Sequence, residues 1–197
     1  MDMKTLESYT DIFTCIASAT TVRSLHKFEH HTLIYVYSGK LEIISDCRQF
    51  VLMEGTCAFI ASGQMAQLTA SPAGRGEIHA VMLNIPLCFL CEFFHTLHGT
   101  KTQDAKKINV MELPDLPNYQ SLFQSLVPYY EMEGEIPQSI FRLKMAEGIY
   151  ALLATDKRFY RTLFGSILDN SIGILDVISG TTASLIKWTT VQDLKAI

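Results

Sequence analysis

Turn signals punctuate the first hundred residues at intervals of about ten, and this spacing constrains the fold more than any other feature of the chain. The runs between these turns are rich in β-branched and aromatic residues, as strands are. The strand-like runs are Thr32–Tyr37, Lys40–Ser45, Gln49–Leu52, Thr56–Ile60, Ala66–Ala70 and Glu77–Ile85. Ser38 and Gly39 predict a hairpin between the first two runs. Short strands at this spacing favour a small β-sandwich or barrel.

The hydrophobic period changes after Pro86, from that of strands to that of helices. The predicted helical segments are Leu87–His98, Tyr119–Tyr130, Gln138–Leu153 and Phe159–Leu168. In the third of these, the candidates for the buried side are Ile140, Leu143, Ile149, Leu152 and Leu153. The order of strands first and helices second predicts an α+β fold.

Composition excludes several classes of function. The chain of 197 residues is 48% hydrophobic, which is enough for a core, and its net charge of −4 argues against a chain that grips nucleic acid by itself. The longest apolar stretch, Ile78 to Leu97, contains Asn84, Pro86 and Glu92, so we expect no membrane span. The polar, acidic start lacks the pattern of a signal peptide, and we therefore expect a cytoplasmic protein.

Residues 26 to 70 keep the spacing of a cupin metal site and lack most of its ligands. The positions that match the four metal ligands are His26, Phe28, Thr32 and Ala66. The positions that match the turn-forming and neighbouring residues are Gly39, Gly55, Ala61, Gly63 and Ala70. A divalent metal needs three or more nitrogen, oxygen or sulfur ligands, and one histidine does not supply them. The pattern predicts a cupin-like β-barrel, or double-stranded β-helix, that binds without a metal or other cofactor.

Three segments resemble parts of AraC/XylS-type transcription regulators. Residues 31–43 are similar to the strand–Ser-Gly–strand unit of the family's cupin-like domain. Residues 139–168 resemble the dimerisation and linker helices of the branch found in virulence regulators of gut bacteria. The Lys187-Trp188 segment, which runs to Leu194, is similar to the start of the first helix of the family's DNA-binding domain.

This resemblance implies a domain organisation. It comprises an effector-binding barrel in residues 1–100, a helical dimerisation and linker region in 101–180, and the start of a helix-turn-helix domain in 181–197. Because the chain ends at Ile197, inside the first helix of that domain, we expect it to sense or dimerise but not to bind an operator. DNA binding would require the missing C-terminal domain.

A cluster of basic residues precedes the first strong strand, at an edge that lines the barrel mouth in a cupin. Such groups can receive a carboxylate or another small anion through charge-assisted hydrogen bonds. The candidate ligand-binding residues are Arg23, His26, Lys27, His30, His31, Thr32 and Tyr35. Because Glu29 lies among them, a solvated loop of mixed charge is the alternative interpretation.

The apolar residues of the 138–153 helix are a candidate dimer face. The proposed dimerisation residues are Phe141, Met145, Ile149, Tyr150 and Leu153. A helix that is apolar on nearly all sides usually has two partners, and the second partner here would be another subunit. The alternative is that these residues pack wholly on the barrel.

A Cys-x2-Cys-x3-His-x2-His run extends from Cys88 to His98 and has the composition of a zinc site. One straight helix does not place four ligands around a tetrahedral ion, so we interpret the run as core packing.

The kind of effector and the class of function each keep alternatives. The effector is a small molecule, for which an anionic group is one option, or a partner protein. The rivals to a regulator are a protein-binding module without a small ligand and a small cupin enzyme.

Overall fold

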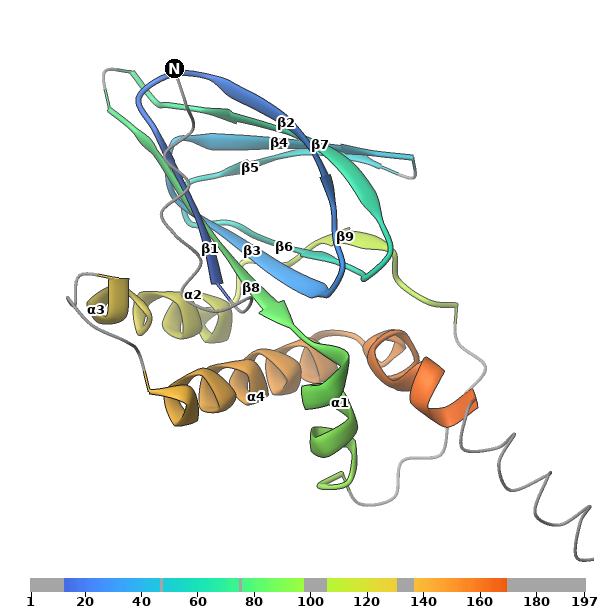
Figure 1. Ribbon diagram of the computed structural model, residues 1–197. Helices are drawn as coiled ribbons and strands as arrows, with labels where there is room; N and C mark the ends of the chain where they lie inside the picture. Colours follow the sequence, from blue (N-terminus) through green and yellow to red (C-terminus); the bar gives the residue numbers. More distant parts are fainter. Residues whose placement is uncertain (1–12, 47, 75, 98–105, 131–136, 170–197) are drawn as a thin grey trace, which may run out of the picture. The chain divides into compact units, whose positions relative to one another are not determined.

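The computed structural model describes residues 13–46, 48–74, 76–97, 106–130 and 137–169. The chain divides into two units, Met1–Leu163 and Phe164–Ile197, and all elements labelled in Figure 1 belong to the first. In this unit two β-sheets face each other, and the helices lie against the outer side of one sheet (Figure 1). The predicted α+β fold is therefore confirmed.

Nine strands form the described sheets, and all their pairings are antiparallel. The first sheet has the order β1 (Phe13–Ser18), β8 (Ile78–Ile85), β3 (His31–Ser38), β6 (Cys57–Ile60) and β9 (Val110–Glu112). The second sheet has the order β2 (Val22–Lys27), β7 (Met65–Ser71), β4 (Lys40–Ser45) and β5 (Gln49–Met53). We call the two sheets together the barrel. The predicted strand runs are confirmed to within about one residue, whereas β1, β2 and β9 were not predicted as strands.

The hairpin predicted at Ser38 and Gly39 is wrong. Strand β3 pairs with β6 and β8 in the first sheet, and β4 pairs with β5 and β7 in the second. Gly39 is a corner at which the chain passes from one sheet to the other, after an irregularity in the β3–β8 register between Val36 and Ser38. Gly39 has a φ of +82°, and a Cβ there would lie 2.8 Å from the Ser71 carbonyl oxygen, so only glycine fits this corner.

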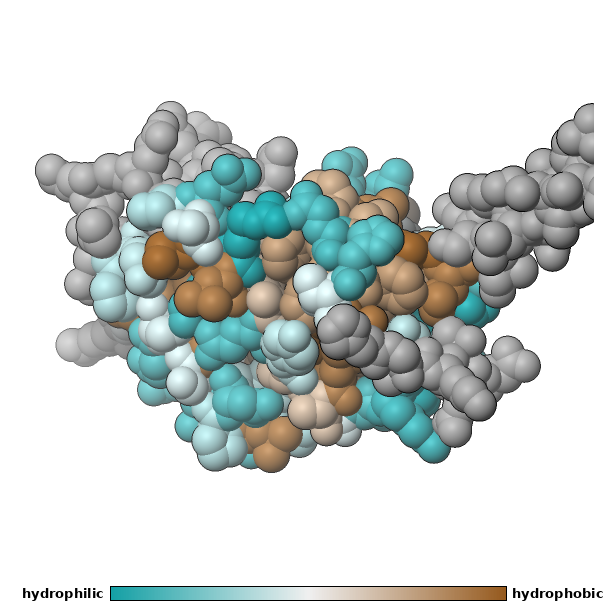
Figure 2. All heavy atoms as spheres, turned by 90° about the horizontal axis from the view of Figure 1, so that it is seen from below, coloured by the Kyte–Doolittle hydropathy of each residue, from teal (hydrophilic) through white to brown (hydrophobic). Residues whose placement is uncertain are grey.

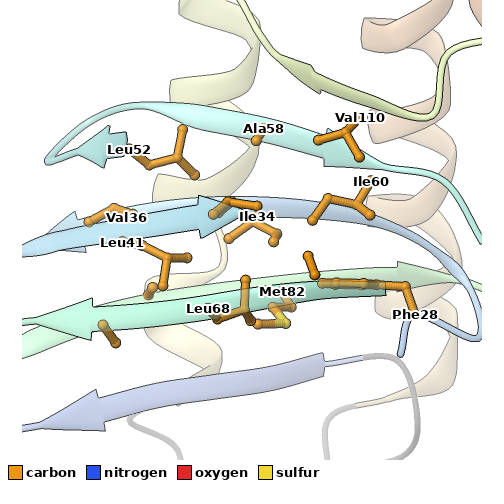
Figure 3. Packing of buried hydrophobic residues seen from close by; sticks show 14 of the residues in the cluster. Phe28, Ile34, Val36, Leu41, Leu52, Ala58, Ile60, Leu68, Met82 and Val110 are labelled. Atoms are coloured by element: carbon orange, nitrogen blue, oxygen red, sulfur yellow. The ribbon is translucent and has the colours of Figure 1, made fainter. Parts of the chain in front are cut away.

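Alternation along the strands fills the space between the sheets with apolar side chains (Figure 3). On β3, Ile34 and Val36 point into this interior, and on β4 Leu41 and Ile43 do so. These four side chains have no exposed surface. The odd-numbered residues of β3 point to the other side, where the helices lie. The first sheet is therefore buried on both faces, which explains the nearly continuous hydrophobic run of β3.

Four labelled helices follow the main strands. They are α1 (Leu87–Phe94), α2 (Pro117–Gln124), α3 (Val127–Tyr130) and α4 (Gln138–Thr155). Residues 158–169 are also helical. Helix α4 lies close to the first sheet at Gly148, where a Cβ would be 3.0 Å from the Leu33 Cδ1 atom. Most of the predicted helical segments are thus confirmed, with two differences. The segment predicted as one helix over Tyr119–Tyr130 is divided into α2 and α3, and α1 ends at Phe94, earlier than the predicted end at His98.

The predicted domain boundaries do not all fall in the described part of the chain. Strand β9 follows residue 100 and pairs with β6, so the first sheet draws on both sides of that predicted boundary. The Trp188 segment, with the rest of 181–197, lies outside the described residues. None of the helices that the structure describes has the length and hydrophobicity needed to cross a bilayer.

Candidate functional site

A polar pocket of about 300 Å³ opens at one end of the barrel, and we call it the mouth pocket. Its residues come from β1, β2, the loop after β2, the start of β3 and the end of β8. They are Thr14, His26, Lys27, Phe28, Glu29, His30, Thr32 and Asn84. The pocket therefore collects chain segments that the sheet pairing brings together from widely separated positions.

Hydrogen bonds order the wall of the mouth pocket. The buried Thr32 hydroxyl lies 2.9 Å from Asn84 Oδ1 and 3.1 Å from the His30 carbonyl oxygen, and its single proton is shared between these two acceptors. Thr32 and Asn84 are also directly opposite each other in the β3–β8 register. Two polar side chains thus stand at fixed positions beside the more exposed Lys27 and Glu29.

The charge of the mouth pocket depends on pH. Partial burial lowers the pKa of His26, while the nearby Glu29 carboxylate acts in the opposite direction. His26 is therefore mainly neutral at pH 7 and gains a proton on acidification. Lys27 and Glu29 add one basic and one acidic side chain to the lining of the pocket.

Four of the predicted ligand residues, His26, Lys27, His30 and Thr32, line the mouth pocket together. Arg23 does not line it, because it pairs with Thr69 further back along β2. Sequence reasoning missed the contributions of Thr14 and Asn84. The signal that could have found Asn84 was its polar amide near the end of a mainly apolar strand.

His31 and Tyr35 serve as packing residues in this structure. The His31 ring stacks on Phe59 with 5.8 Å between centroids, and its Nδ1 accepts a hydrogen bond of 3.3 Å from the Ser62 N–H. Burial, with the nearby His30 and Lys107, lowers the pKa of His31 to about 4, so the ring is neutral at pH 7. Tyr35 is 3% exposed and stacks on Phe123 of α2, on the helix side of β3 and not on the pocket side.

The residues that match the cupin metal-ligand positions do lie close together but do not fit a metal. His26, Phe28 and Thr32 line the mouth pocket, and Ala66 is the cross-strand partner of His26. Phenylalanine and alanine donate no ligand atom, and a threonine hydroxyl with one imidazole is not a set that holds a divalent ion. Among the residues that the structure describes, no group of three or more His, Cys, Asp or Glu side chains is placed to bind a metal.

The outer face of α4 carries a second concave surface, which we call the α4 groove. Its volume is about 550 Å³, and its residues are Asn118, Leu143, Ala146, Glu147, Tyr150, Ala151 and Ala154. Leu143 is 61% exposed and Tyr150 is 55% exposed. Seen from the helix side of the molecule, hydrophobic residues are interspersed with hydrophilic ones (Figure 2).

The predicted dimerisation residues divide between two faces of α4. Phe141, Met145 and Ile149 are buried within the chain, so their side chains are not accessible to a second subunit. Tyr150 is exposed and Leu153 is half-buried. Leu143 was expected on the buried side but is exposed, because the inner face of α4 follows Phe141, Met145 and Gly148 instead.

Helix α1 connects the mouth pocket to α4. Asn84 is the last residue but one of β8, and α1 begins directly after Pro86. On α4, Arg142 forms an ion pair with Glu92 and lies 5.3 Å from the centre of the Phe89 ring. The ring of Phe93 contacts Tyr150 edge to face at 5.1 Å. The pocket wall and the α4 groove are thus linked by one short helix.

Comparison with known proteins identifies the family. The model of the ExsA N-terminal regulatory domain matches residues 31–161, which is most of the chain. The chain belongs to this family. It is therefore a regulatory domain of the AraC-type virulence regulators, as the sequence motifs indicated. No curated protein matches the chain at a significant level.

Solved structures of ToxT from Vibrio cholerae share the fold. An apo lysine-to-alanine variant matches with a TM-score of 0.56 and 12% identity, over 79% of this chain and 59% of that one. Wild-type ToxT with a bound unsaturated fatty acid matches with a TM-score of 0.52 and 9% identity, over 76% of this chain and 57% of that one. The chain thus spans less than two thirds of the length of these proteins.

Proposed function

We propose that the mouth pocket binds a small polar effector that carries an anionic group. The observation that carries this proposal is the convergence of Lys27, His26, Thr32 and Asn84 on one pocket that lacks a set of metal ligands. Such a pocket has the shape of a binding site without the chemistry of a metalloenzyme. One ToxT structure holds a bound unsaturated fatty acid, which supports the idea that a protein containing a domain of this fold accepts a carboxylic acid as its ligand.

Charge defines the kind of effector. The anionic group would approach the Lys27 ammonium, because charge-assisted hydrogen bonds are the strong ones. Glu29 lines the same pocket and would repel a second anionic group, but it accepts a hydrogen bond from a hydroxyl or amine. The pocket therefore favours a small monoanion that also carries a donor group, such as a hydroxy acid. Acidification would strengthen its binding, since His26 then adds a positive charge.

Calorimetric titration tests the effector proposal. We expect lactate to bind more tightly than propionate, which lacks the hydroxyl, and Lys27→Gln to weaken lactate binding about tenfold. Lys40→Gln is the matched control, because Lys40 is an exposed lysine at the start of β4, outside the mouth pocket. Equal losses in the two variants, or heats of dilution only for every monoanion tried, would refute an anion site at Lys27.

We also propose that the domain self-associates through the α4 groove. In a two-fold symmetric pair the same surface is used twice, so antiparallel α4 helices would place Leu143 of one protomer beside Tyr150 of its partner. Ala146, Ala151 and Ala154 have small side chains that allow the helices to approach closely. Phe141, Met145 and Ile149 would contribute indirectly, by holding α4 on the barrel.

The link through α1 gives a route by which effector binding would alter self-association. A ligand that contacts Asn84 would change the balance between two arrangements of α1 only if it binds one of them more tightly. Helix α1 would then shift α4 through the Glu92–Arg142 pair and the Phe93–Tyr150 contact. In a full-length regulator, this change would reposition a DNA-binding domain that follows the Trp188 segment.

Light scattering over a concentration series tests the self-association. We expect a monomer–dimer equilibrium whose dissociation constant changes when lactate is present. A partner protein is the second candidate occupant of the α4 groove, and the open, apolar lining of the groove favours a protein surface over a small polar molecule. A molecular mass that stays monomeric up to millimolar concentration would refute the dimer. A partner protein would then be the remaining candidate for the α4 groove.

A further inference from the structure

Phe28 lies at the boundary between the mouth pocket and the barrel interior. It follows β2 at a position that points inward, and it is 1% exposed. Its ring lies among the interior side chains between the two sheets (Figure 3). On its other side, Phe28 is one of the residues that line the mouth pocket. The side chain therefore forms the floor of the pocket.

The backbone and ring of Phe28 are both held in place. Its N–H donates to the Gln64 carbonyl oxygen at 2.9 Å, and its carbonyl oxygen accepts a hydrogen bond of 2.7 Å from the Gly63 N–H. The ring packs edge to face on the His26 ring with 4.6 Å between centroids. With the backbone fixed at both polar groups, the pocket can deepen only if the ring rotates out of the interior, which would expose buried apolar surface to water.

The Phe28 ring fills the end of the barrel interior behind this floor. Ala66, the buried cross-strand partner of His26 at this end, has only a methyl side chain and does not fill the space that the ring occupies. A smaller residue at position 28 would leave an apolar cavity open to the mouth pocket, and apolar cavities of this kind accept hydrocarbon groups.

From this arrangement we infer that Phe28 determines the specificity of the effector site by excluding alkyl chains from the barrel interior. The inference rests on the proposed function, because it assumes a ligand whose polar group binds at the mouth. It limits that ligand to a molecule about the size of the mouth pocket, without a long hydrocarbon tail.

A series of straight-chain carboxylates from butyrate to decanoate tests this inference. Binding is followed by NMR through the backbone amides of Thr32 and Asn84, so that a chain bound in the α4 groove is not counted. For the wild-type protein we expect dissociation constants that agree within about threefold along the series. For Phe28→Ala we expect decanoate to bind at least tenfold more tightly than butyrate, since each added methylene gains buried area.

Phe123→Ala is the matched control, because it removes a buried ring from the helix side of the first sheet. We expect it to keep the wild-type insensitivity to chain length. A folded Phe28→Ala protein without chain-length dependence would overturn the inference. A tenfold rise in the affinity of the wild-type protein with chain length would also overturn it. This second result is obtained without any variant.

The two proposals fail in different ways. If the Thr32 and Asn84 amides of the wild-type protein report tighter binding of long-chain carboxylates, the role of Phe28 is contradicted and the effector site stands. Binding of decanoate by Phe28→Ala, with no carboxylate bound by the wild type, would support the role of Phe28 and contradict the effector site.

Discussion

The mouth pocket and the α4 groove differ in chemistry, and the difference separates two tasks. The mouth pocket is lined by charged and hydrogen-bonding side chains held by strands of both sheets. The α4 groove is lined mainly by alanine, leucine and tyrosine on one helix. Polar groups at fixed positions suit recognition of a small molecule, whereas exposed apolar side chains on a helix suit a protein surface.

The largest effect that we expect is a difference in stability between substitutions on the two faces of α4. Ile149 is fully buried against the barrel, so Ile149→Ala should lower the free energy of unfolding by roughly 3 kcal/mol through lost burial and the cavity it leaves. Leu143→Ala, on the exposed face, should change it by no more than about 0.5 kcal/mol. Urea denaturation of both variants measures the difference. Similar losses would mean that α4 does not pack on the barrel as described.

For self-association we expect the exposed face of α4 to be the sensitive one. Leu143→Asp places a charge in the α4 groove and should raise the dimer dissociation constant at least 30-fold, equivalent to about 2 kcal/mol. Leu25→Asp is the control, since Leu25 is 69% exposed but lies on β2 in the other sheet. Sedimentation velocity gives both constants. A dimer weakened by Leu25→Asp and not by Leu143→Asp would move the interface to the second sheet.

The stability of the domain should be sensitive to acid through His31, which packs on Phe59. Its folded pKa of about 4 lies below the ordinary value of 6.5, so the unfolded chain binds the proton first as the pH falls. Stability is therefore fully present above pH 6.5 and is lost between pH 6.5 and pH 4, by roughly 2 kcal/mol from pH 7 to pH 5.

His31→Gln should remove this part of the pH dependence, as measured by urea denaturation at pH 7 and pH 5. His95→Gln is the control, because that exposed histidine caps the end of α1, and it should keep the wild-type dependence. An unchanged loss of stability in His31→Gln would show that another group is responsible.

The smallest expected effect is on the polar wall of the mouth pocket. Thr32→Val keeps the side-chain shape and removes the hydrogen bond to Asn84, which should cost about 1 kcal/mol of stability. Thr56→Val removes a solvent-exposed hydrogen bond to the Met53 carbonyl oxygen and should cost less. Thermal unfolding of the two variants provides the comparison. A larger loss for Thr56→Val would mean that Thr32 is not buried in a hydrogen-bonded wall.

Local sequence signals predicted the strands well but not how they assemble. Turn residues and β-branched runs marked β3 to β8, because these signals act within a few residues. The three-residue β9 is too short to carry such a pattern, and β2 contains Arg23, Lys27 and other polar residues that resemble a loop. The turn at Gly39 predicted a change of direction, but whether the next strand joins the same sheet depends on distant pairings.

The predicted ligand residues that line the mouth pocket are close in sequence, although His31 lies among them and packs on Phe59 instead. His26, Lys27, His30 and Thr32 lie within seven positions, and all four line the mouth pocket. Thr14 and Asn84 join them only through the pairing of β1, β3 and β8. On α4, apolar residues occur on every side, so the pattern alone does not distinguish the buried Ile149 from the exposed Leu143.

The most direct test of the account is a map of amide chemical-shift changes over the described residues during a lactate titration. We predict that the large changes will lie at Lys27, His30, Thr32 and Asn84, with smaller ones along α1 and few in the second sheet away from the mouth. Changes centred on Leu143 to Ala154, without any at Thr32 and Asn84, would contradict the assignment of the effector site to the mouth of the barrel.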